Sequence, residues 1–182
     1  MRTLYRCLAV AVTITLTISG TLVAQDGGKA NNRGGLWGGI GLGYGLLGVL
    51  DCPGSGCDTE GGLSGNARIG LTASPSLRFA VGTNGWYKDV EGIGFSAGLL
   101  SLQAMFYPGA GDFFLLAGGG FASIDCEICD ADTGAGFLIG GGYDFPLNDS
   151  GSLALTPYAN WIVTTIDSNP YVLQFGLGLT FN

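Results

Sequence analysis

The chain has 182 residues, a formal net charge of −7 and no histidine, and only 12% of its residues are charged. Hydrophobic residues make up 47%, glycines number 35, and the mean hydropathy is +0.39. A soluble domain normally carries about a quarter charged residues, and each glycine costs roughly 1 kcal/mol in a helix interior. The composition therefore argues against an ordinary soluble domain and against a helical protein, and we expect no nucleic-acid partner.

The N-terminus has the pattern of an export signal. Arg2 and Arg6 precede an uncharged apolar run that ends near the small residue Ala24. This pattern predicts a secretory signal peptide over residues 1–25, followed by a flexible linker over 26–35 and one domain over 36–182. The exported part has no stretch of about 18 apolar residues that could form a spanning helix. High apolarity without such a helix fits a transmembrane β-barrel, in which every strand shows one face to lipid.

Period-2 alternation of apolar residues predicts eight strands. Around Leu99-Leu100 the phase is unclear, which is compatible with a bulge. Turn-bounded strands at this near-regular spacing predict a sandwich or a barrel, and most exceed the 9–11 residues that cross a membrane. The predicted strands are 36–50, 62–73, 77–89, 93–107, 112–124, 135–147, 152–166 and 171–182.

The last predicted strand alternates without interruption and has an aromatic residue next to its end. It resembles the C-terminal strand of bacterial outer-membrane barrels, which usually ends on an aromatic residue; here Asn182 follows. We expect it to pair with the first strand, so that neither strand has a free edge. We also expect the barrel assembly machinery to recognise it as an insertion signal. The expected insertion signal is the outward set Tyr171, Leu173, Phe175, Leu177, Leu179 and Phe181.

Charged and aromatic residues separate toward opposite ends of the predicted barrel. An interfacial aromatic girdle is expected of a membrane barrel, whereas a soluble sandwich has no reason to gather aromatics at one end. The acidic residues near the predicted outer end are Asp51, Asp58, Glu60, Asp89, Glu91, Asp125, Glu127, Asp130, Asp132 and Asp167. The aromatic residues near the predicted periplasmic end are Trp37, Phe79, Phe106, Tyr107, Phe113, Phe114, Phe145 and Phe181.

In its architecture and its C-terminal strand, the chain resembles the small eight-stranded outer-membrane barrels of the OmpA/OmpX type. The resemblance implies an all-β, antiparallel up-and-down transmembrane barrel in the bacterial outer membrane. A monomer in contact with lipid and lipopolysaccharide is expected. Three functions stay open: a structural or surface-interaction role through acidic loops, a narrow channel for ions or small apolar molecules, and a soluble secreted barrel that binds a lipid-like ligand.

Four cysteines follow the predicted signal peptide, as a C-x4-C pair, Cys52 and Cys57, and a C-x2-C pair, Cys126 and Cys129. An exported chain meets an oxidising compartment, which favours two disulfides over a zinc site or a redox pair. Three connectivities are formally possible. We expect local pairing within each loop, because the two loops would lie opposite one another around the barrel.

The second cysteine pair is surrounded by carboxylates: Asp125, Glu127, Asp130 and Asp132. This spacing lacks the later ligands and the closing glutamate of an EF-hand. A solvated acidic loop is therefore expected, with a weak Ca²⁺ or Mg²⁺ site as the alternative. No other cofactor is expected.

Several polar residues fall on the predicted inner faces of the strands. Charges inside a barrel must be paired or hydrated, so a structural polar plug is expected and a narrow ion path is the alternative. The lack of histidine removes Ser-His and most metal-hydrolase arrangements, and we expect no enzymatic activity. The predicted inner residues are Asn66, Arg68, Arg78, Asn84, Lys88, Asp144, Asn160 and Gln174.

Overall fold

The computed structural model describes residues 34–50, 59–128 and 130–182. It contains eight long antiparallel strands, one two-residue strand and one short 3-10 helix, η1. The strands are β1 (Leu36–Val49), β2 (Glu60–Ser74), β3 (Leu77–Val90), β4 (Ile93–Phe106), β5 (Phe113–Cys126), β6 (Asp132–Tyr143), β7 (Phe145–Pro146), β8 (Leu153–Thr164) and β9 (Pro170–Phe181), and η1 covers Pro108–Ala110.

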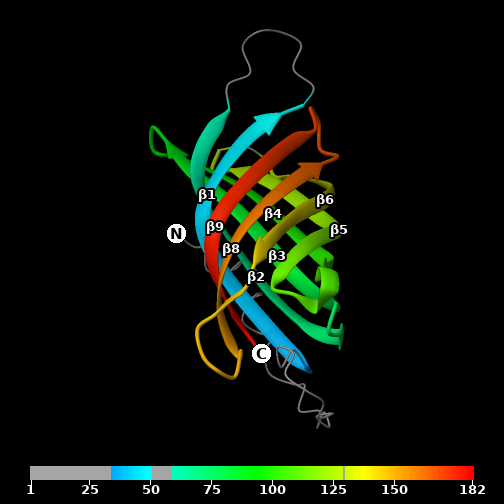
Figure 1. Ribbon diagram of the computed structural model, residues 1–182. Coiled ribbons are helices and arrows are strands. Elements are labelled where there is room, and N and C mark those ends of the chain that lie inside the picture. The colour runs from blue at the N-terminus through cyan, green and yellow to red at the C-terminus, as the bar shows by residue number, and fades with distance from the viewer. Residues whose placement is uncertain (1–33, 51–58, 129) are drawn as a thin grey trace.

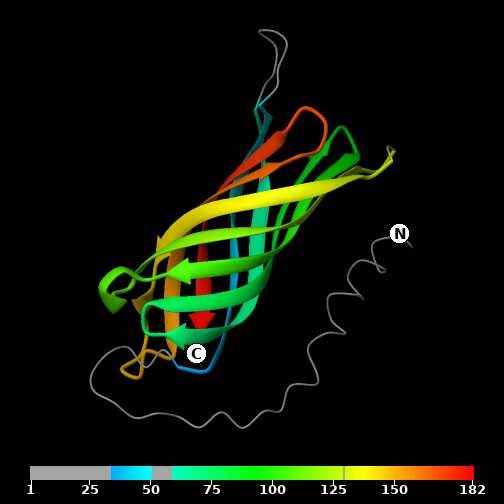
Figure 2. The same cartoon turned by 90° about the vertical axis from the view of Figure 1, so that its right-hand side faces the viewer.

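The sheet closes into a barrel. Neighbouring strands pair in sequence from β1 to β6, β6 pairs with β8, β8 pairs with β9, and β9 pairs with β1. Figure 1 and Figure 2 show the strands tilted around a common axis. The β1–β9 ladder runs from Gly38↔Phe181 to Val49↔Pro170. The prediction that the last strand closes the barrel on the first is therefore confirmed, and neither of these strands has a free edge.

The barrel has two distinct ends. The terminal end is where β1 begins and β9 ends, and it also carries the β2–β3 turn, η1 and β7. The distal end carries the connections β1–β2, β3–β4, β5–β6 and β8–β9. There, Glu91 and Gly92 link β3 to β4 with φ of 54° and 83°, as a tight two-residue hairpin with positive φ at both positions requires. In the part of the chain that is described, no helix is long and apolar enough to span a membrane.

Two sequence expectations about strand shape are wrong. β4 pairs with both neighbours without a register shift, because Leu99 faces inward and Leu100 outward; the phase was obscured since both are leucines. The irregularity lies in β2, between Thr72 and Ser74. The sixth strand ends at Tyr143 rather than at residue 147, and after Asp144 the chain continues as β7, which pairs with β8.

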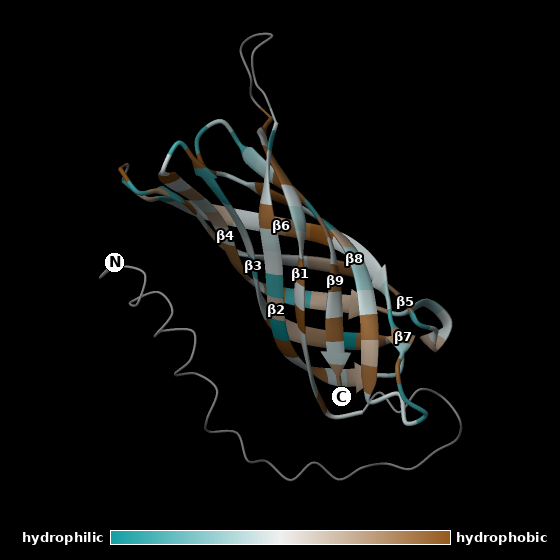
Figure 3. Ribbon diagram, turned by 90° about the vertical axis from the view of Figure 1, so that its left-hand side faces the viewer, coloured by the Kyte–Doolittle hydropathy of each residue, from teal (hydrophilic) through white to brown (hydrophobic). Residues whose placement is uncertain are grey.

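The outer wall is apolar. Side chains that point outward along the strands are exposed leucines, isoleucines and phenylalanines, with Leu42 and Leu102 each 70% exposed. Figure 3 shows hydrophobic residues along the strands of the wall. Soluble monomers rarely expose such a continuous apolar surface, whereas a closed barrel with an apolar outer band suits a bilayer. The wall of this barrel therefore faces lipid.

The inner-face glycines make room for large interior side chains. A Cβ on Gly45 would lie 2.6 Å from Cδ1 of Trp86, and one on Gly62 would lie 2.8 Å from its Cε2. In the same way, a Cβ on Gly41 would lie 2.7 Å from Cε1 of Tyr158. Eight strands enclose a space just wide enough for side chains to fill, so the glycines set which bulky residues fit there.

Candidate functional site

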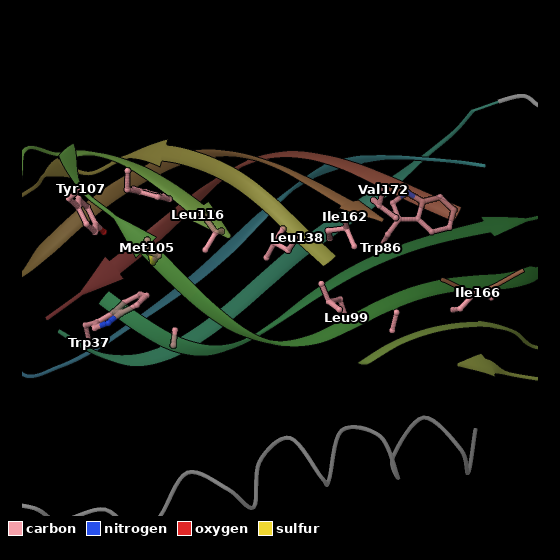
Figure 4. Close-up of a cluster of buried hydrophobic side chains, with 13 residues drawn as sticks. Trp37, Trp86, Leu99, Met105, Tyr107, Leu116, Leu138, Ile162, Ile166 and Val172 are labelled. Atoms are coloured by element: carbon pink, nitrogen blue, oxygen red, sulfur yellow. The ribbon is translucent and has the colours of Figure 1, made fainter. Parts of the chain in front are cut away.

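The barrel interior is filled by three layers of side chains from different strands. Figure 4 shows Trp37 and Tyr107 toward one end and Trp86 and Val172 toward the other. We call the three layers the terminal plug (Trp37, Arg78, Tyr107, Phe114 and Asp144), the amide belt (Asn84, Gln103, Asn160 and Gln174) and the distal apolar layer (Trp86, Leu99, Leu138, Ile162 and Val172), and all of these residues are buried.

The terminal plug is organised around Arg78 on β3. The guanidinium carbon of Arg78 lies 5.2 Å from the ring centroid of Trp37 and 5.3 Å from that of Tyr107. Such cation–π contacts gain strength when they are desolvated, and Arg78 is only 1% exposed. The rings of Tyr107 and Phe114 pack with centroids 5.5 Å apart. Together these side chains fill the terminal end of the lumen.

Hydrogen bonds tie the terminal plug to the strands around it. Tyr107 donates to Oδ2 of Asp144 (3.0 Å), and Thr156 donates to Oδ1 of the same carboxylate (2.8 Å). Nη2 of Arg78 donates to Oδ1 of Asn182 at 2.6 Å. Bonds with an ionised partner are roughly twice as strong as neutral ones. Asn182, which follows the last aromatic residue, therefore helps to hold the charged centre of the plug.

The amide belt lies above the terminal plug and joins β3, β4, β8 and β9. Asn84 donates to Oε1 of Gln174 (2.9 Å), which also accepts from Asn160 (3.5 Å). Gln103 donates to Asn84 (3.4 Å), and Nε2 of Gln174 donates to the carbonyl of Gly85 (3.0 Å). Linked buried amides of this kind rigidify a core when their partners are in place.

The distal apolar layer completes the filling. Trp86 donates its indole N–H to the carbonyl of Gly45 (3.0 Å), so the largest side chain of this layer has its polar atom satisfied. Two voids inside the wall have volumes of about 10 Å³ each, which is room for about one water molecule. The interior of the described barrel is thus packed.

Most of the predicted inner residues lie inside the barrel, at different levels of the lumen. Arg68, Arg78, Asn84, Asp144, Asn160 and Gln174 are buried inside the barrel. Asn66 is half-buried on the inner face. Lys88 lies at the distal rim, where its ammonium group forms an ion pair with Glu60. The polar residues are therefore spread along the lumen in separate groups.

Three predicted members of the aromatic girdle lie inside the barrel. Trp37, Tyr107 and Phe114 are 2%, 0% and 0% exposed, respectively, so their assignment to the lipid interface is wrong. Near strand ends both faces carry apolar residues, so proximity to an end does not distinguish inward from outward aromatic side chains. Parity along the strand could have done so, because Trp37 shares its face with Gly39 and Gly41. The aromatic residues that remain outward at the terminal end are Phe79, Phe106, Phe113, Phe145 and Phe181.

Four further interior residues are not among the predicted ones. They are buried and polar or amphipathic: Tyr158, Gln103, Ser101 and Thr156. Their signal was again parity: Gln103 alternates with the outward Leu102, and Tyr158 lies two residues from Asn160. The interior therefore contains more polar residues than the charged and amide side chains predicted from the sequence.

The distal rim is acidic. Among its described residues, Lys88 is the sole base, and it is already paired with Glu60. Asp51 and Asp58 lie outside the described residues. No group of three or more His, Cys, Asp or Glu residues in the described ranges could hold a metal ion, and calcium binding stays a prediction. The exposed acidic residues of the rim are Glu60, Asp89, Glu91, Asp125, Glu127, Asp130, Asp132 and Asp167.

Of the predicted disulfide cysteines, only Cys126 is described. It ends β5, is 6% exposed and is disulfide-bonded. Cys52, Cys57 and Cys129 lie outside the described residues, so the connectivity stays a prediction. The predicted signal peptide, 1–25, and most of the linker, 26–35, also lie outside them.

A larger groove of about 690 Å³ lies along β3 to β6. Its lining includes Thr83, Leu100, Phe121 and Ala135, which point outward by their position in the strands. Phe121 is 80% exposed. The groove therefore belongs to the lipid-facing wall and not to the lumen.

No protein-family model matches the sequence, and no curated protein sequence matches it. Solved structures do match the fold. Ail, the attachment invasion locus protein of Yersinia pestis, has a TM-score of 0.57 at 15% identity, covering 82% of this chain and 99% of its own. Neisserial surface protein A has a TM-score of 0.54 at 15% identity, covering 80% and 96%. The N-terminal β-barrel domain of Pseudomonas aeruginosa OprF has a TM-score of 0.51 at 12% identity, covering 81% and 98%.

The chain is a small transmembrane β-barrel, with eight long strands, a lipid-facing apolar wall and an aromatic rim at one end. It has the fold of the small bacterial outer-membrane barrels, and it lies in the outer membrane, where barrels of this kind are found. The apolar wall argues against the alternative of a soluble secreted barrel.

Proposed function

We propose that the protein is a monomeric, non-enzymatic surface protein of the outer membrane that acts through its acidic distal rim. The observation that carries this proposal is the filled lumen. The terminal plug, the amide belt and the distal apolar layer occupy its length, and the voids inside the wall are of single-water size. A conduit for ions or apolar molecules would need a continuous path, so the working surface is expected at an end of the barrel.

The distal rim is the surface to which the proposal assigns the function. With the terminal end toward the periplasm, the connections that carry the acidic residues face the outside of the cell. Exposed charge of one sign steers a partner of opposite charge over a distance set by salt. The proposed partner is therefore a basic surface on another macromolecule or cell. The predicted disulfides would limit the mobility of the loops that present this rim.

The structural comparisons support a surface role without fixing its partner. Ail is named for attachment and invasion, and NspA is named as a surface protein. Those descriptions belong to these proteins, and at 15% identity they transfer no binding residue. The partner chemistry proposed for this chain rests on its own charges.

Two measurements test the proposal, one on the purified, folded protein and one on cells that display it. In planar bilayers we expect no steady conductance, whereas reproducible channel steps would contradict the packed lumen. Displayed on cells, the protein should increase adhesion to a surface coated with a basic protein, and added salt should weaken that adhesion.

The adhesion assay has a matched control within the chain. Combined neutralisation of the distal rim by Asp89→Asn, Glu91→Gln and Glu127→Gln should reduce adhesion, whereas Asp149→Asn, an exposed carboxylate at the terminal end, should not. Equal adhesion by the wild type and the rim variant would show that the acidic rim is not the binding surface.

A further inference from the structure

Arg68 on β2 differs from Arg78 in its surroundings. Arg68 is 9% exposed, and its Nε and Nη2 have no hydrogen-bond acceptor within the described residues. Arg78, by contrast, has Asn182 as an acceptor and two aromatic rings beside it. A buried guanidinium without a partner is strongly destabilising unless something compensates its charge.

The charge count inside the barrel does not supply that compensation. The inner faces of the described strands carry two buried guanidiniums, Arg68 and Arg78, and one buried carboxylate, Asp144. Both oxygens of Asp144 already accept hydrogen bonds, from Tyr107 and Thr156. The interior therefore holds one more positive charge than negative charge.

Beside Arg68 lies one of the voids of about 10 Å³, which is also lined by Asn66, Tyr158, Thr156 and Thr180. Nδ2 of Asn66 and the hydroxyl of Tyr158 are buried and lack a partner too. These two groups are close enough to interact, but neither atom has a partner in hydrogen-bonding geometry. The unpartnered atoms at this void are thus nitrogens that donate and a hydroxyl that can donate.

The void bridges the seam at which the barrel closes. Asn66 and Arg68 lie on β2 and Tyr158 on β8, and the sheet order places β1 and β9 between these strands. The seam strands present glycines to the void, including Gly39 and Gly178. A Cβ on Gly41 would lie 2.7 Å from the ring of Tyr158 and 2.9 Å from Nδ2 of Asn66. The absence of side chains at Gly39, Gly41 and Gly178 lets groups from β2 and β8 reach one common ligand.

We propose that this void is a binding site for a small monovalent anion of halide size, held by Arg68, Asn66 and Tyr158. An anion accepts hydrogen bonds from all these donors and balances the excess positive charge, whereas a water molecule accepts through only two lone pairs and leaves the charge. The void has room for about one water-sized particle, which excludes polyatomic anions; a monatomic halide fits once the flexible side chains of Arg68 and Asn66 shift slightly outward. The bound anion links β2 to β8 across the seam and so resists opening of the barrel.

Anion-dependent unfolding tests the proposal. The folded full-length protein in non-ionic detergent is unfolded at constant ionic strength in mixtures of chloride and gluconate, followed by heat-modifiable gel mobility. A ligand that binds only the folded state at about 100 times its Kd shifts the folding equilibrium about 100-fold. Chloride and bromide should therefore raise the unfolding midpoint over gluconate, and crystals grown in bromide should show anomalous scattering beside Arg68.

Variants separate this site from general salt effects. Arg68→Met should remove the chloride dependence, Tyr158→Phe should weaken it, and Lys88→Met, which removes a cation at the distal rim, should leave it unchanged. If Arg68→Met fails to fold, Tyr158→Phe and the bromide crystal still decide the matter. Equal midpoints in chloride and gluconate, or a bromide map without a peak at Arg68, would show that the void holds only water. A chloride effect of unchanged size in Tyr158→Phe and Arg68→Met would place the anion elsewhere.

Discussion

The phenyl ring of Phe181 lies over Gly38 where β9 meets β1. The two residues are direct partners in the ladder, and a Cβ on Gly38 would lie 2.6 Å from Cε2 of Phe181. An aromatic ring that covers a cross-strand glycine stabilises the register at that point. The last aromatic residue of the chain therefore covers the seam of the barrel in addition to its predicted role in insertion.

We expect Phe181→Ala to destabilise the barrel more than Phe106→Ala. Both phenylalanines lie at the terminal end with similar exposure, 50% and 49%, so both lose similar lipid contact. Cross-strand aromatic contacts contribute about 0.2–1 kcal/mol. The ring of Phe181 covers its partner Gly38, whereas the partners of Phe106 are Leu77 and Leu115, which keep their own side-chain packing. The free energy of unfolding by urea, measured in lipid vesicles, gives the difference. Equal losses in the two variants would remove the special role of the seam.

A second prediction concerns the glycines under Trp86. Gly45→Ala would place a Cβ 2.6 Å from Cδ1 of Trp86, and overpacking of this kind costs about 1–3 kcal/mol. The matched control is Gly85→Ala on the outer face, where a Cβ meets nothing within 4 Å. Tryptophan fluorescence during urea unfolding reports both stability and the displaced indole. A Gly45→Ala variant as stable as Gly85→Ala would mean that Trp86 moves aside without cost.

The strands could be predicted from the sequence because period-2 alternation is strong wherever one face meets lipid. The first strand was expected at 36–50 and covers Leu36–Val49, and the last was expected at 171–182 and covers Pro170–Phe181. The alternation loses information where both faces are apolar, as at Leu99 and Leu100. There, only the pairing with neighbouring strands determines which residue points inward.

The interior could be predicted less completely than the wall. Charged and amide side chains are recognisable as inner residues, because lipid would penalise them on the outer face. Tryptophan and tyrosine are found both at lipid interfaces and in a packed lumen. The residue type therefore does not decide on which side of the wall Trp37 and Tyr107 lie, and only the structure shows it. The contact of Trp86 with one glycine on β1 and one on β2 depends on the strand register. The register cannot be derived from a single sequence.

A third prediction concerns the amide belt. Gln174→Leu removes the acceptor of Asn84 and leaves its buried Nδ2 unsatisfied, which costs about 1–3 kcal/mol. Asn84→Leu breaks the same bond from the other side. Since the two residues share one interaction, the double variant should lose less stability than the sum of the single variants. Urea unfolding of all four proteins provides this comparison, and strict additivity would show that the bond contributes nothing.

The last prediction concerns Asn182 and its bond to Arg78. Asn182→Ala removes the acceptor 2.6 Å from Nη2 of Arg78, and a hydrogen bond to a charged group contributes about 1.5–3 kcal/mol. The partly exposed position places the expected loss toward the lower value, because water can replace part of the bond. Asn182→Asp keeps an acceptor at this position and should retain most of the stability. The two variants differ little in the outward insertion signal, so folding yield into vesicles should be similar while the unfolding midpoints differ. If both variants unfold like the wild type, Asn182 does not stabilise the terminal plug.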